Sequence, residues 1–209
     1  MPPSGLIERL SRVSGLDVSR ETFDRLEAYA DLLRNAASQQ NLVAPSTIET
    51  MWERHILDSA QLLGLAPNGG TWADVGSGAG LPGIVLAILS SDPITLIEPR
   101  RLRAEFLSGV AEKLELTNVS VQCARVERVY GQFDVITARA VAQLDRLLAI
   151  AGHLSNSGTV WVLPKGRNAQ SELAQARRNW HCDALVEQSC TDPESQILVL
   201  TRVGAKKKR

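Results

Sequence analysis

Three glycines at alternate positions separate a short apolar run from a helical stretch. The pattern predicts a buried strand over residues 71–75 and a helix over residues 82–91, with Gly76, Gly78 and Gly80 between them. Glycine lets the backbone turn sharply and approach a ligand closely, and the free N–H groups at the start of the following helix favour an anionic group. The sequence therefore predicts a ligand-binding turn between a strand and a helix.

The rest of the chain after residue 70 alternates in the same way. Short apolar runs separated by helical stretches are typical of a mainly parallel sheet with helices on both faces. The further strands are expected over residues 94–97, 120–124, 133–138 and 158–163, and the further helices over residues 101–115, 140–154 and 168–180. Two last strands, over residues 184–190 and 196–203, predict an antiparallel hairpin that closes this α/β fold.

The first 66 residues have a helical pattern instead. Apolar side chains recur there every three or four residues between charged ones. The clearest examples are Phe23, Leu26, Ala30 and Leu33. A second helix is expected from Ser46, because Glu49 follows three residues later and the two side chains match a capping box. We therefore expect a helical segment over residues 1–66 packed on an α/β domain over residues 67–204, with a disordered basic tail over residues 205–209.

Composition excludes some classes of protein. The chain has 23 basic and 23 acidic residues, so a nucleic-acid contact needs a local patch rather than a cationic surface as a whole. The apolar runs fall far short of the roughly 20 residues that cross a bilayer, and no signal peptide is recognisable, so we expect a cytoplasmic protein without a membrane contact. Three cysteines lack metal-type or disulfide spacing, and we expect no metal site.

The glycine turn selects a ligand class. A dinucleotide fingerprint would have its third glycine where Leu81 stands, and no Lys-Ser/Thr pair follows as in an ATPase loop. Glu98 ends the second strand, where a carboxylate can accept both hydroxyls of a ribose. S-adenosylmethionine fits, with its carboxylate at the amides of Gly76, Gly78 and Gly80, its ribose at Glu98, and its positive charge near Asp74. The alternative is an ordinary tight turn followed by a surface glutamate.

Five motifs extend this interpretation to most of the chain. They are Asp74–Gly83, Arg54–Ser59, Ala124–Glu127, Thr137–Ala140 and Leu163–Gly166. From about Asn41 to Val203 the sequence resembles the bacterial small-subunit ribosomal RNA guanine-N7 methyltransferase family, also called glucose-inhibited division protein B. The resemblance implies a Rossmann-like class I methyltransferase that transfers a methyl group from S-adenosylmethionine to N7 of one guanine in 16S ribosomal RNA.

The same resemblance assigns residues to the site. It implies that Gly76, Leu81, Val126, Glu127 and Arg139 line the cofactor. It also implies that Asn41, Arg125, Arg139 and Lys165 surround the catalytic cleft or the RNA. The chain departs from the family at Leu102-Arg103, where a Lys-Arg pair is usual, and at Gln196, where an arginine is usual. We assign no RNA contact to Gln196.

The expected chemistry needs no general base. Guanine N7 has a lone pair and no hydrogen, so the main task is to hold the reacting atoms in line. Arg125, Arg139 and Lys165 are then binders of phosphate or of guanine O6, and solvated charges or structural ion pairs are the alternative. His55 lies on the apolar side of its helix, so we expect a hydrogen-bonded core histidine rather than a base.

Charge is unevenly distributed along the chain. Residues 1–66 hold six basic and nine acidic residues, whereas residues 100–178 hold twelve basic and seven acidic ones, a difference of +5. The second part suits a phosphate backbone. We therefore expect a monomer that acts on 16S ribosomal RNA or the small ribosomal subunit. A methyltransferase of a small molecule and a non-catalytic RNA-binding assembly factor remain open alternatives.

Overall fold

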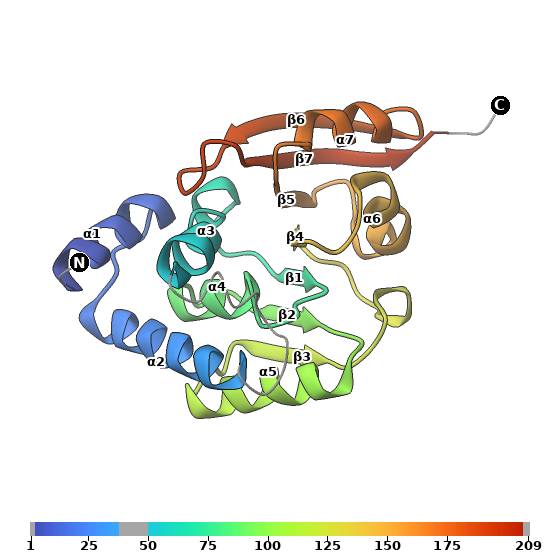
Figure 1. Ribbon diagram of the computed structural model, residues 1–209. Coiled ribbons are helices and arrows are strands. Elements are labelled where there is room, and N and C mark those ends of the chain that lie inside the picture. Colours follow the sequence, from blue (N-terminus) through green and yellow to red (C-terminus); the bar gives the residue numbers. More distant parts are fainter. Residues whose placement is uncertain (1–2, 38–49, 207–209) are drawn as a thin grey trace.

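A seven-stranded sheet forms the centre of the computed structural model, which describes residues 3–37 and 50–206. The strand order is β3-β2-β1-β4-β5-β7-β6, in which the first five strands are parallel and β7 is antiparallel to both neighbours (Figure 1). The strands are β1 (Trp72–Val75), β2 (Ile94–Ile97), β3 (Val119–Gln122), β4 (Val135–Thr137), β5 (Val160–Lys165), β6 (Trp180–Gln188) and β7 (Gln196–Ala205). The predicted parallel sheet with a closing hairpin is confirmed.

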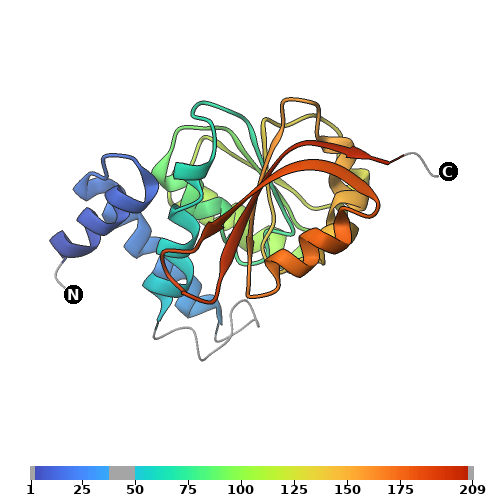
Figure 2. The ribbon, with the colours of Figure 1, turned by 90° about the horizontal axis from the view of Figure 1, so that it is seen from above.

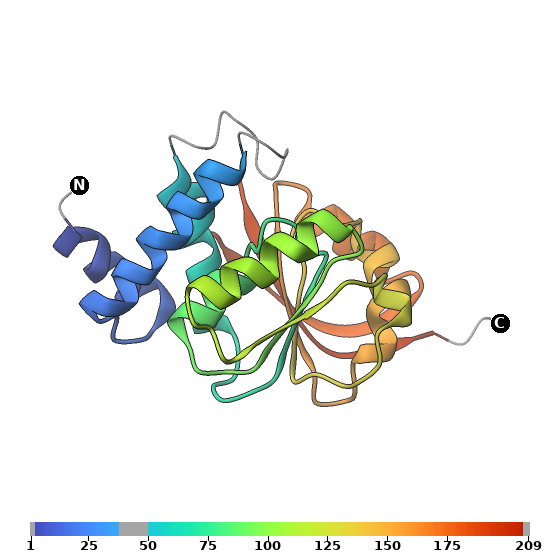
Figure 3. The same ribbon diagram turned by 90° about the horizontal axis from the view of Figure 1, so that it is seen from below.

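Helices cover both faces of this sheet (Figures 2 and 3). The α-helices are α1 (Pro3–Ser14), α2 (Arg20–Ala37), α3 (Asp58–Ala60), α4 (Gly83–Leu89), α5 (Arg101–Lys113), α6 (Leu144–Ala151) and α7 (Ala169–Ala176). A π-helix, η2 (Trp52–Leu57), precedes α3, and three 3₁₀ turns are η3 (Leu63–Leu65), η4 (Val126–Arg128) and η5 (Gly152–Leu154). Figure 3 shows α2 and α5 in front of the twisted sheet.

Alternate residues of the central strands belong to two separate cores. Trp72 and Val135 pack with helices α1 to α5, whereas their neighbours Ala73 and Ile136 pack with η4, α6 and α7. This alternation follows from the two-residue period of a strand. We call these two sides of the sheet the α2–α5 face and the α6–α7 face.

The N-terminal helices share the core of the α2–α5 face. Phe23, Leu26, Ala30 and Leu33 are fully buried, as the sequence pattern predicted, and α2 packs against α4. Trp52 stacks on Phe23 with the ring centroids 5.1 Å apart. In the part of the chain that the structure describes, no helix combines the length and the hydrophobicity of a membrane span.

Two predicted helices are wrong in their extent. Residues 140–143 form a turn, because Ala140 has a positive φ of 56° and α6 begins only at Leu144. The helix expected over residues 168–180 ends at Ala176, since Trp180 starts β6 and pairs with Ala205 of β7. Its indole also donates to Asp145, so tertiary contacts override the helical pattern.

The segment before the sheet differs from the expected single helix. It consists of η2, α3 and η3, and the predicted capping pair Ser46 and Glu49 lies outside the described residues. The hairpin strands are longer than predicted. In particular, β7 continues through Ala205, one residue past the predicted limit of the α/β domain.

Candidate functional site

The glycine turn after β1 has the backbone conformation that its sequence predicts. Gly76, Gly78 and Gly80 have φ values of 70°, 59° and 96°. This left-handed region is one that side chains other than glycine rarely adopt. The turn leads into α4 at the carboxyl edge of the sheet, beside β4, where the strand order changes direction. In open α/β sheets this is the position at which ligands bind.

The glycines of this turn do not all serve the same purpose. A Cβ at Gly80 would lie 2.6 Å from Ile84 Cγ1, and one at Gly83 would lie 2.2 Å from Leu96 Cδ2. At Gly78 the nearest atom would be the Gly76 carbonyl oxygen at 3.7 Å. Gly80 and Gly83 are therefore required by packing, whereas Gly78 keeps an open approach to the backbone.

Asp74 holds the turn from inside the protein. It is fully buried, and its Oδ2 accepts the Gly83 N–H at 3.0 Å, which fixes the start of α4. Burial raises the pKa of this carboxyl to about 7, against the lowering effect of the Gly83 hydrogen bond. Its Oδ1 has no hydrogen-bond partner among the described residues. A buried polar atom without a partner is costly, so this oxygen is suited to a donor from a ligand.

Glu98 lies at the end of β2, as predicted, but its carboxylate is already used by the backbone. Its Oε2 accepts the Gly78 N–H at 3.0 Å, and its Oε1 accepts the Arg100 N–H at 2.8 Å. The residue is buried, with 3% of its surface exposed. Each carboxylate oxygen keeps a further acceptor position. Glu98 thus ties the glycine turn to β2 and can still accept a hydroxyl.

Helix α2 also supports the glycine turn, through the side chain of Tyr29. Tyr29 is fully buried, and its Oη donates to the Ala79 carbonyl oxygen at 2.9 Å. Burial raises the pKa of this phenol above its ordinary value, so it remains a donor. This contact could not be predicted from the sequence, because Tyr29 fits the apolar pattern of α2 equally well as a simple core residue.

A cavity of about 470 Å³ opens next to the glycine turn, between the ends of β4 and β5, the η2–α3 segment and the turn between β6 and β7. Charged and polar side chains line most of it. They include Arg54, His55, Asp58, Arg139, Lys165, Glu172, Thr191, Asp192 and Gln196. Val141 also lines the cavity, and a Cβ at Gly76 would lie 2.6 Å from its Cγ2. Val141 therefore joins the cavity to the glycine turn.

Arg139 is held in this cavity by the η2–α3 segment. Its Nη1 donates to the Arg54 carbonyl oxygen at 3.2 Å and lies 3.3 Å from Asp58 Oδ2, and its Nη2 lies 2.9 Å from His55 Nδ1. His55 is 6% exposed, which confirms the predicted hydrogen-bonded core histidine. Burial and the Arg139 charge lower the pKa of His55 to about 4, so at neutral pH the ring is uncharged and Nδ1 accepts the bond.

Lys165 is enclosed in a second set of contacts. Its Nζ lies 2.8 Å from Glu172 Oε2 and donates to the Ala142 carbonyl oxygen at 3.1 Å, and 9% of its side chain is exposed. Glu172 Oε2 also accepts the Leu144 N–H at 2.8 Å, at the start of α6. Lys165 thus orders the turn over residues 140–143, which carries Val141 across the glycine turn.

The other predicted residues are spread more widely. Val126 and Glu127 lie on η4, where Val126 is buried and Glu127 is exposed, and Leu81 packs in the core, so that only its backbone can reach a ligand. Arg125 is exposed directly before η4 and does not line the cavity. Asn41 lies outside the described residues. The structure therefore brings Arg139 and Lys165 together, and not Arg125.

Three contributors to the site were not predicted from the sequence. Tyr29 supports the glycine turn, Glu172 pairs with Lys165, and Asp58 accepts from Arg139, Gln61 and Thr191. Asp58 stands within the Arg54–Ser59 motif, so a signal for it was present. Groups of His, Cys, Asp and Glu that could hold a metal ion are absent from residues 3–37 and 50–206.

Comparison with solved structures agrees with this fold. A SAM-dependent methyltransferase from Aquifex aeolicus superimposes with a TM-score of 0.58 at 15% identity, covering 76% of this chain and 98% of that one. TYW2 from M. jannaschii, solved in complex with AdoMet, gives a TM-score of 0.57 at 14% identity, over 79% and 78% of the two chains. At these identities the likeness establishes the Rossmann-like fold alone.

Sequence comparison goes further than the fold. A "Ribosomal RNA small subunit methyltransferase G" from Zymomonas mobilis subsp. mobilis is 45% identical over 204 residues, covering 93% of this chain and 92% of the relative. The protein of the same name from Sphingopyxis alaskensis is 48% identical over 194 residues, covering 91% and 83%. A profile of the family described as rRNA small subunit methyltransferase G matches residues 22–198. The chain belongs to this family.

Proposed function

We propose that this protein transfers a methyl group from S-adenosylmethionine to N7 of a guanine in 16S ribosomal RNA. The observation that carries the proposal is the position of Val141, which contacts the glycine turn on one side and lines the cavity on the other. A donor site and an acceptor site are then separated by one side chain. The names of relatives that are 45% and 48% identical supply the substrate class, ribosomal RNA of the small subunit.

The residues around the glycine turn fit the methyl donor. The open side of Gly78 admits a ligand to the backbone of the turn, Asp74 Oδ1 has no partner among the described residues, and Glu98 can accept a ribose hydroxyl. The predicted contact of the cofactor carboxylate with the amides of Gly76, Gly78 and Gly80 is not supported, because these amides already donate to Ile97, Glu98 and Ser77. Val126 and Glu127, on η4 after β3, would border the same ligand. S-adenosylmethionine, when bound, supplies an electrophilic methyl carbon.

The residues around the cavity suit an acceptor that needs no deprotonation. N7 of guanine has a lone pair and no hydrogen, so a general base has no proton to remove. His55 is uncharged, but its Nδ1 already accepts from Arg139. The proposed work of this chain is therefore to position guanine and to keep it next to the donor.

Arg139 is the residue best suited to hold guanine or its phosphate. A guanidinium can donate one bond to O6, which leaves N7 free to react, or two bonds to a phosphate, and its contacts to His55 and Asp58 fix its direction. Asp58 also offsets its charge, which matters because methylation leaves N7 cationic. Lys165 acts through the turn over residues 140–143, since its Nζ is engaged by Glu172 and Ala142. Arg125 and Asn41 remain predicted RNA or cleft residues.

A methyl-transfer assay tests this proposal. Purified protein is incubated with labelled S-adenosylmethionine and, in parallel, with 16S transcripts, small ribosomal subunits or free guanine nucleotides. We expect 7-methylguanine at one position of the RNA. Label that appears only in the nucleotides would identify a small-molecule enzyme, and S-adenosylmethionine that fails to bind would favour an assembly factor without catalysis.

Arg139→Ala tests the acceptor side of the site. We expect it to lower kcat/KM for RNA about a hundredfold, because a charge-assisted contact to the substrate is lost, while S-adenosylmethionine affinity stays within about twofold. Arg202→Ala, which removes an exposed arginine paired with Asp183 on the hairpin, is the matched control. Equal losses of activity and thermal stability in Arg139→Ala would make that residue structural.

The proposal extends to the working form of the protein. We propose a cytoplasmic monomer whose residues 67–204 form the methyltransferase domain and whose residues 1–66 pack on it as a helical segment. The contact of Tyr29 with Ala79 supports a joint role for the two parts. Sedimentation of the purified protein, alone and with small subunits, measures the oligomeric state.

A further inference from the structure

The arginines of this protein differ between the two faces of the sheet. On the α2–α5 face, most arginines form ion pairs with nearby carboxylates. These pairs are Arg9–Glu53, Arg20–Asp24, Arg25–Glu21, Arg34–Asp31 and Arg101–Glu105. Within the described residues, Arg12 and Arg100 are the arginines of this side that make no side-chain ion pair or hydrogen bond.

On the α6–α7 face, five exposed arginines have no such partners, whereas Arg167 before α7 pairs with Glu194. The five are Arg125 and Arg128 at η4, Arg146 on α6, and Arg177 and Arg178 after α7. None of the five side chains forms an ion pair or hydrogen bond with another described residue. We call these five residues the arginine surface. Charges left unpaired on one face are available to an anionic partner.

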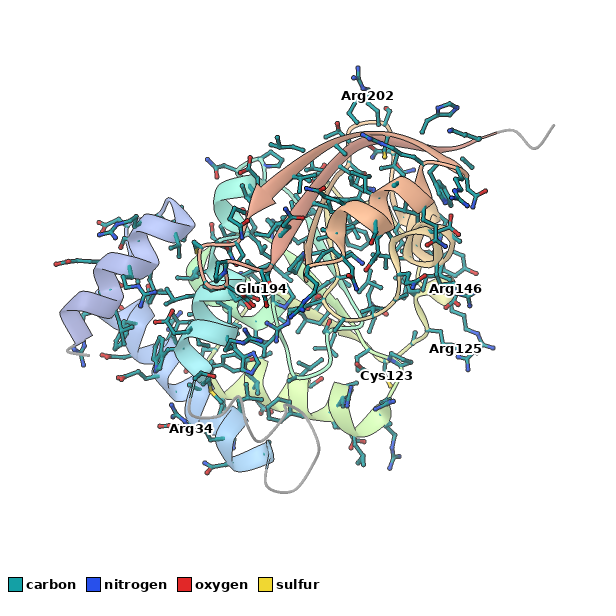
Figure 4. All side chains as sticks on the ribbon, turned by 45° about the horizontal axis from the view of Figure 1, so that its top comes forward. Arg34, Cys123, Arg125, Arg146, Glu194 and Arg202 are labelled. Atoms are coloured by element: carbon teal, nitrogen blue, oxygen red, sulfur yellow. The ribbon has the colours of Figure 1, made fainter. Side chains whose placement is uncertain are left out.

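Contacts between the elements show that the arginine surface is continuous. The turn η4 packs against α6, and Val126 shares a core with Leu144. Next to Arg146, Asp145 Oδ1 accepts from Asn179 Nδ2 at 2.9 Å, which brings the end of α7 against the start of α6. Figure 4 shows Arg125 and Arg146 on the same side of the molecule, away from Arg34.

The arginine surface also carries an exposed aromatic ring. Tyr130 lies two residues after η4 and is 89% exposed, more than any other large apolar or aromatic side chain that the structure describes. A ring that packs on nothing in the protein is suited to stack on an unpaired base. The acidic residues in this region are Glu127, which is exposed, and Asp145, which is hydrogen-bonded to Asn179 and Trp180.

The arginine surface begins near the carboxyl edge of the sheet, where the glycine turn and the cavity lie. Arg125 and Arg128 lie three and six residues after the carboxyl end of β3, and Arg146 stands in the first turn of α6, three residues after the turn that carries Val141. An RNA strand with one nucleotide in the cavity could therefore continue over residues 140–143 and onto η4 and α6. Single-stranded RNA is recognised by this combination of backbone charge and base stacking.

We infer that the arginine surface binds the RNA that flanks the target guanine, with its arginines on phosphates and Tyr130 on an unpaired base. The inference rests on the proposed function for the identity of the RNA. Phosphate contacts supply affinity and orientation without sequence readout. The surface thus holds the substrate in register, while the cavity selects the nucleotide that is methylated.

Two triple variants test this inference. The surface variant carries Arg128→Gln, Arg146→Gln and Arg178→Gln, and the control carries Arg20→Gln, Arg25→Gln and Arg34→Gln on α2. Both lose three positive charges, so a difference between them cannot come from net charge. The dissociation constant for an unmodified 16S transcript is measured across a range of KCl concentrations, together with that for S-adenosylmethionine.

We expect the surface variant to bind the transcript about tenfold more weakly at moderate salt, and its salt slope to fall by about 2, because about 0.7 to 0.9 counterions are released per phosphate contact. The control should match the wild type, and S-adenosylmethionine affinity should be unchanged in both. Tyr130→Ala should weaken RNA binding about tenfold without altering the salt slope, since base stacking is lost and no charge is removed.

Several results would overturn the inference. They are equal RNA binding and equal salt slopes in the two triple variants, loss of S-adenosylmethionine affinity in the surface variant, or tighter binding of wild-type protein to phosphatidylglycerol vesicles than to the transcript. Wild-type protein that binds the transcript through this surface but never methylates it would instead contradict the proposed function and leave the surface supported.

Discussion

The glycine turn and the neighbouring cavity are built from different kinds of interaction. The turn is fixed by backbone conformation and by packing, since Gly80 and Gly83 leave no room for a side chain and Asp74 binds a backbone amide. The cavity is fixed by side chains from distant parts of the chain, among them Arg139 with His55 and Lys165 with Glu172. The glycine turn is therefore held in place by close packing, whereas the cavity is held in place by charged and hydrogen-bonded side chains.

The largest effect should come from filling the packed part of the turn. Gly83→Ala is expected to lower the free energy of unfolding by about 3 kcal/mol, because its Cβ would overlap buried atoms; it would lie 2.2 Å from Leu96 Cδ2 and 2.6 Å from Asp74 Oδ2. Urea denaturation measures this loss. An unfolding free energy within error of the wild type would show that α4 can shift, and that packing does not fix the turn.

Gly78→Ala is the matched substitution at the open part of the same turn. Its φ of 59° costs about 1 kcal/mol for a residue with a Cβ. The methyl group would obstruct the approach of a ligand to the backbone of the turn, so S-adenosylmethionine should bind at least about tenfold more weakly. Calorimetric titration gives the affinity, and an unchanged value in the folded variant would exclude a ligand at Gly78.

The next prediction concerns the ion pair between Lys165 and Glu172, which both line the cavity. Lys165→Met should cost about 2 to 3 kcal/mol of stability, because it leaves Glu172 partly buried without its cation; 9% of the Lys165 side chain and 20% of the Glu172 side chain are exposed. Arg167→Met removes an exposed pair with Glu194 near the same edge and should cost about 0.5 kcal/mol at most. Equal losses in the two variants would place Lys165 at the surface in solution.

These two regions also differ in how far the sequence could predict them. The turn is local, so the order of strand, glycines and helix was sufficient to predict its conformation and its ligand class. Arg139 and His55 stand 84 residues apart in the chain, and Tyr29 and Ala79 stand 50 apart. Such contacts depend on how helices seat on the sheet, and the residue types alone carry no signal for that.

The predicted ends of two helices were wrong for a related reason. The apolar pattern of residues 140–154 continues through the turn over residues 140–143, but Lys165 and Glu172 bind Ala142 and Leu144 and delay the start of α6. Likewise, Trp180 fits a helical pattern and is drawn into β6 by Ala205 and Asp145. In both places contacts that are distant in sequence decide between two locally acceptable conformations.

A further prediction uses pH to separate the two regions. In the turn, the folded-state pKa of Asp74 is about 7, above its value in the unfolded chain, so its contribution to stability falls as pH rises toward 7. In the cavity, the folded-state pKa of His55 is about 4, below its unfolded value near 6.5, so its contribution falls as pH drops from about 6.5 to 4. The two contributions oppose each other in the wild type.

Single variants should therefore shift the stability curve in opposite directions. Relative to the wild type, His55→Asn should gain about 2 kcal/mol between pH 7.5 and pH 5, and Asp74→Asn should gain about 2 kcal/mol between pH 5 and pH 7.5. Asparagine can still accept the bond from Arg139 or from Gly83. The measurement is urea denaturation across this pH range. Parallel curves for wild type and either variant would mean that the substituted residue does not titrate as described.

The smallest effect concerns Tyr29, whose side chain joins α2 to the turn by a hydrogen bond. Tyr29→Phe removes the bond to Ala79 and should cost about 1 kcal/mol of stability and about fivefold in S-adenosylmethionine affinity, because Ala79 stands between Gly78 and Gly80. Ser19→Ala, which removes the bond from the Thr22 N–H to Ser19 Oγ at the start of the same helix, should cost a similar stability and leave that affinity unchanged. With saturating cofactor, kcat for RNA should be the same in both variants, since neither residue lines the cavity. If both variants lose affinity equally, α2 stabilises the whole domain and does not position the turn through Tyr29.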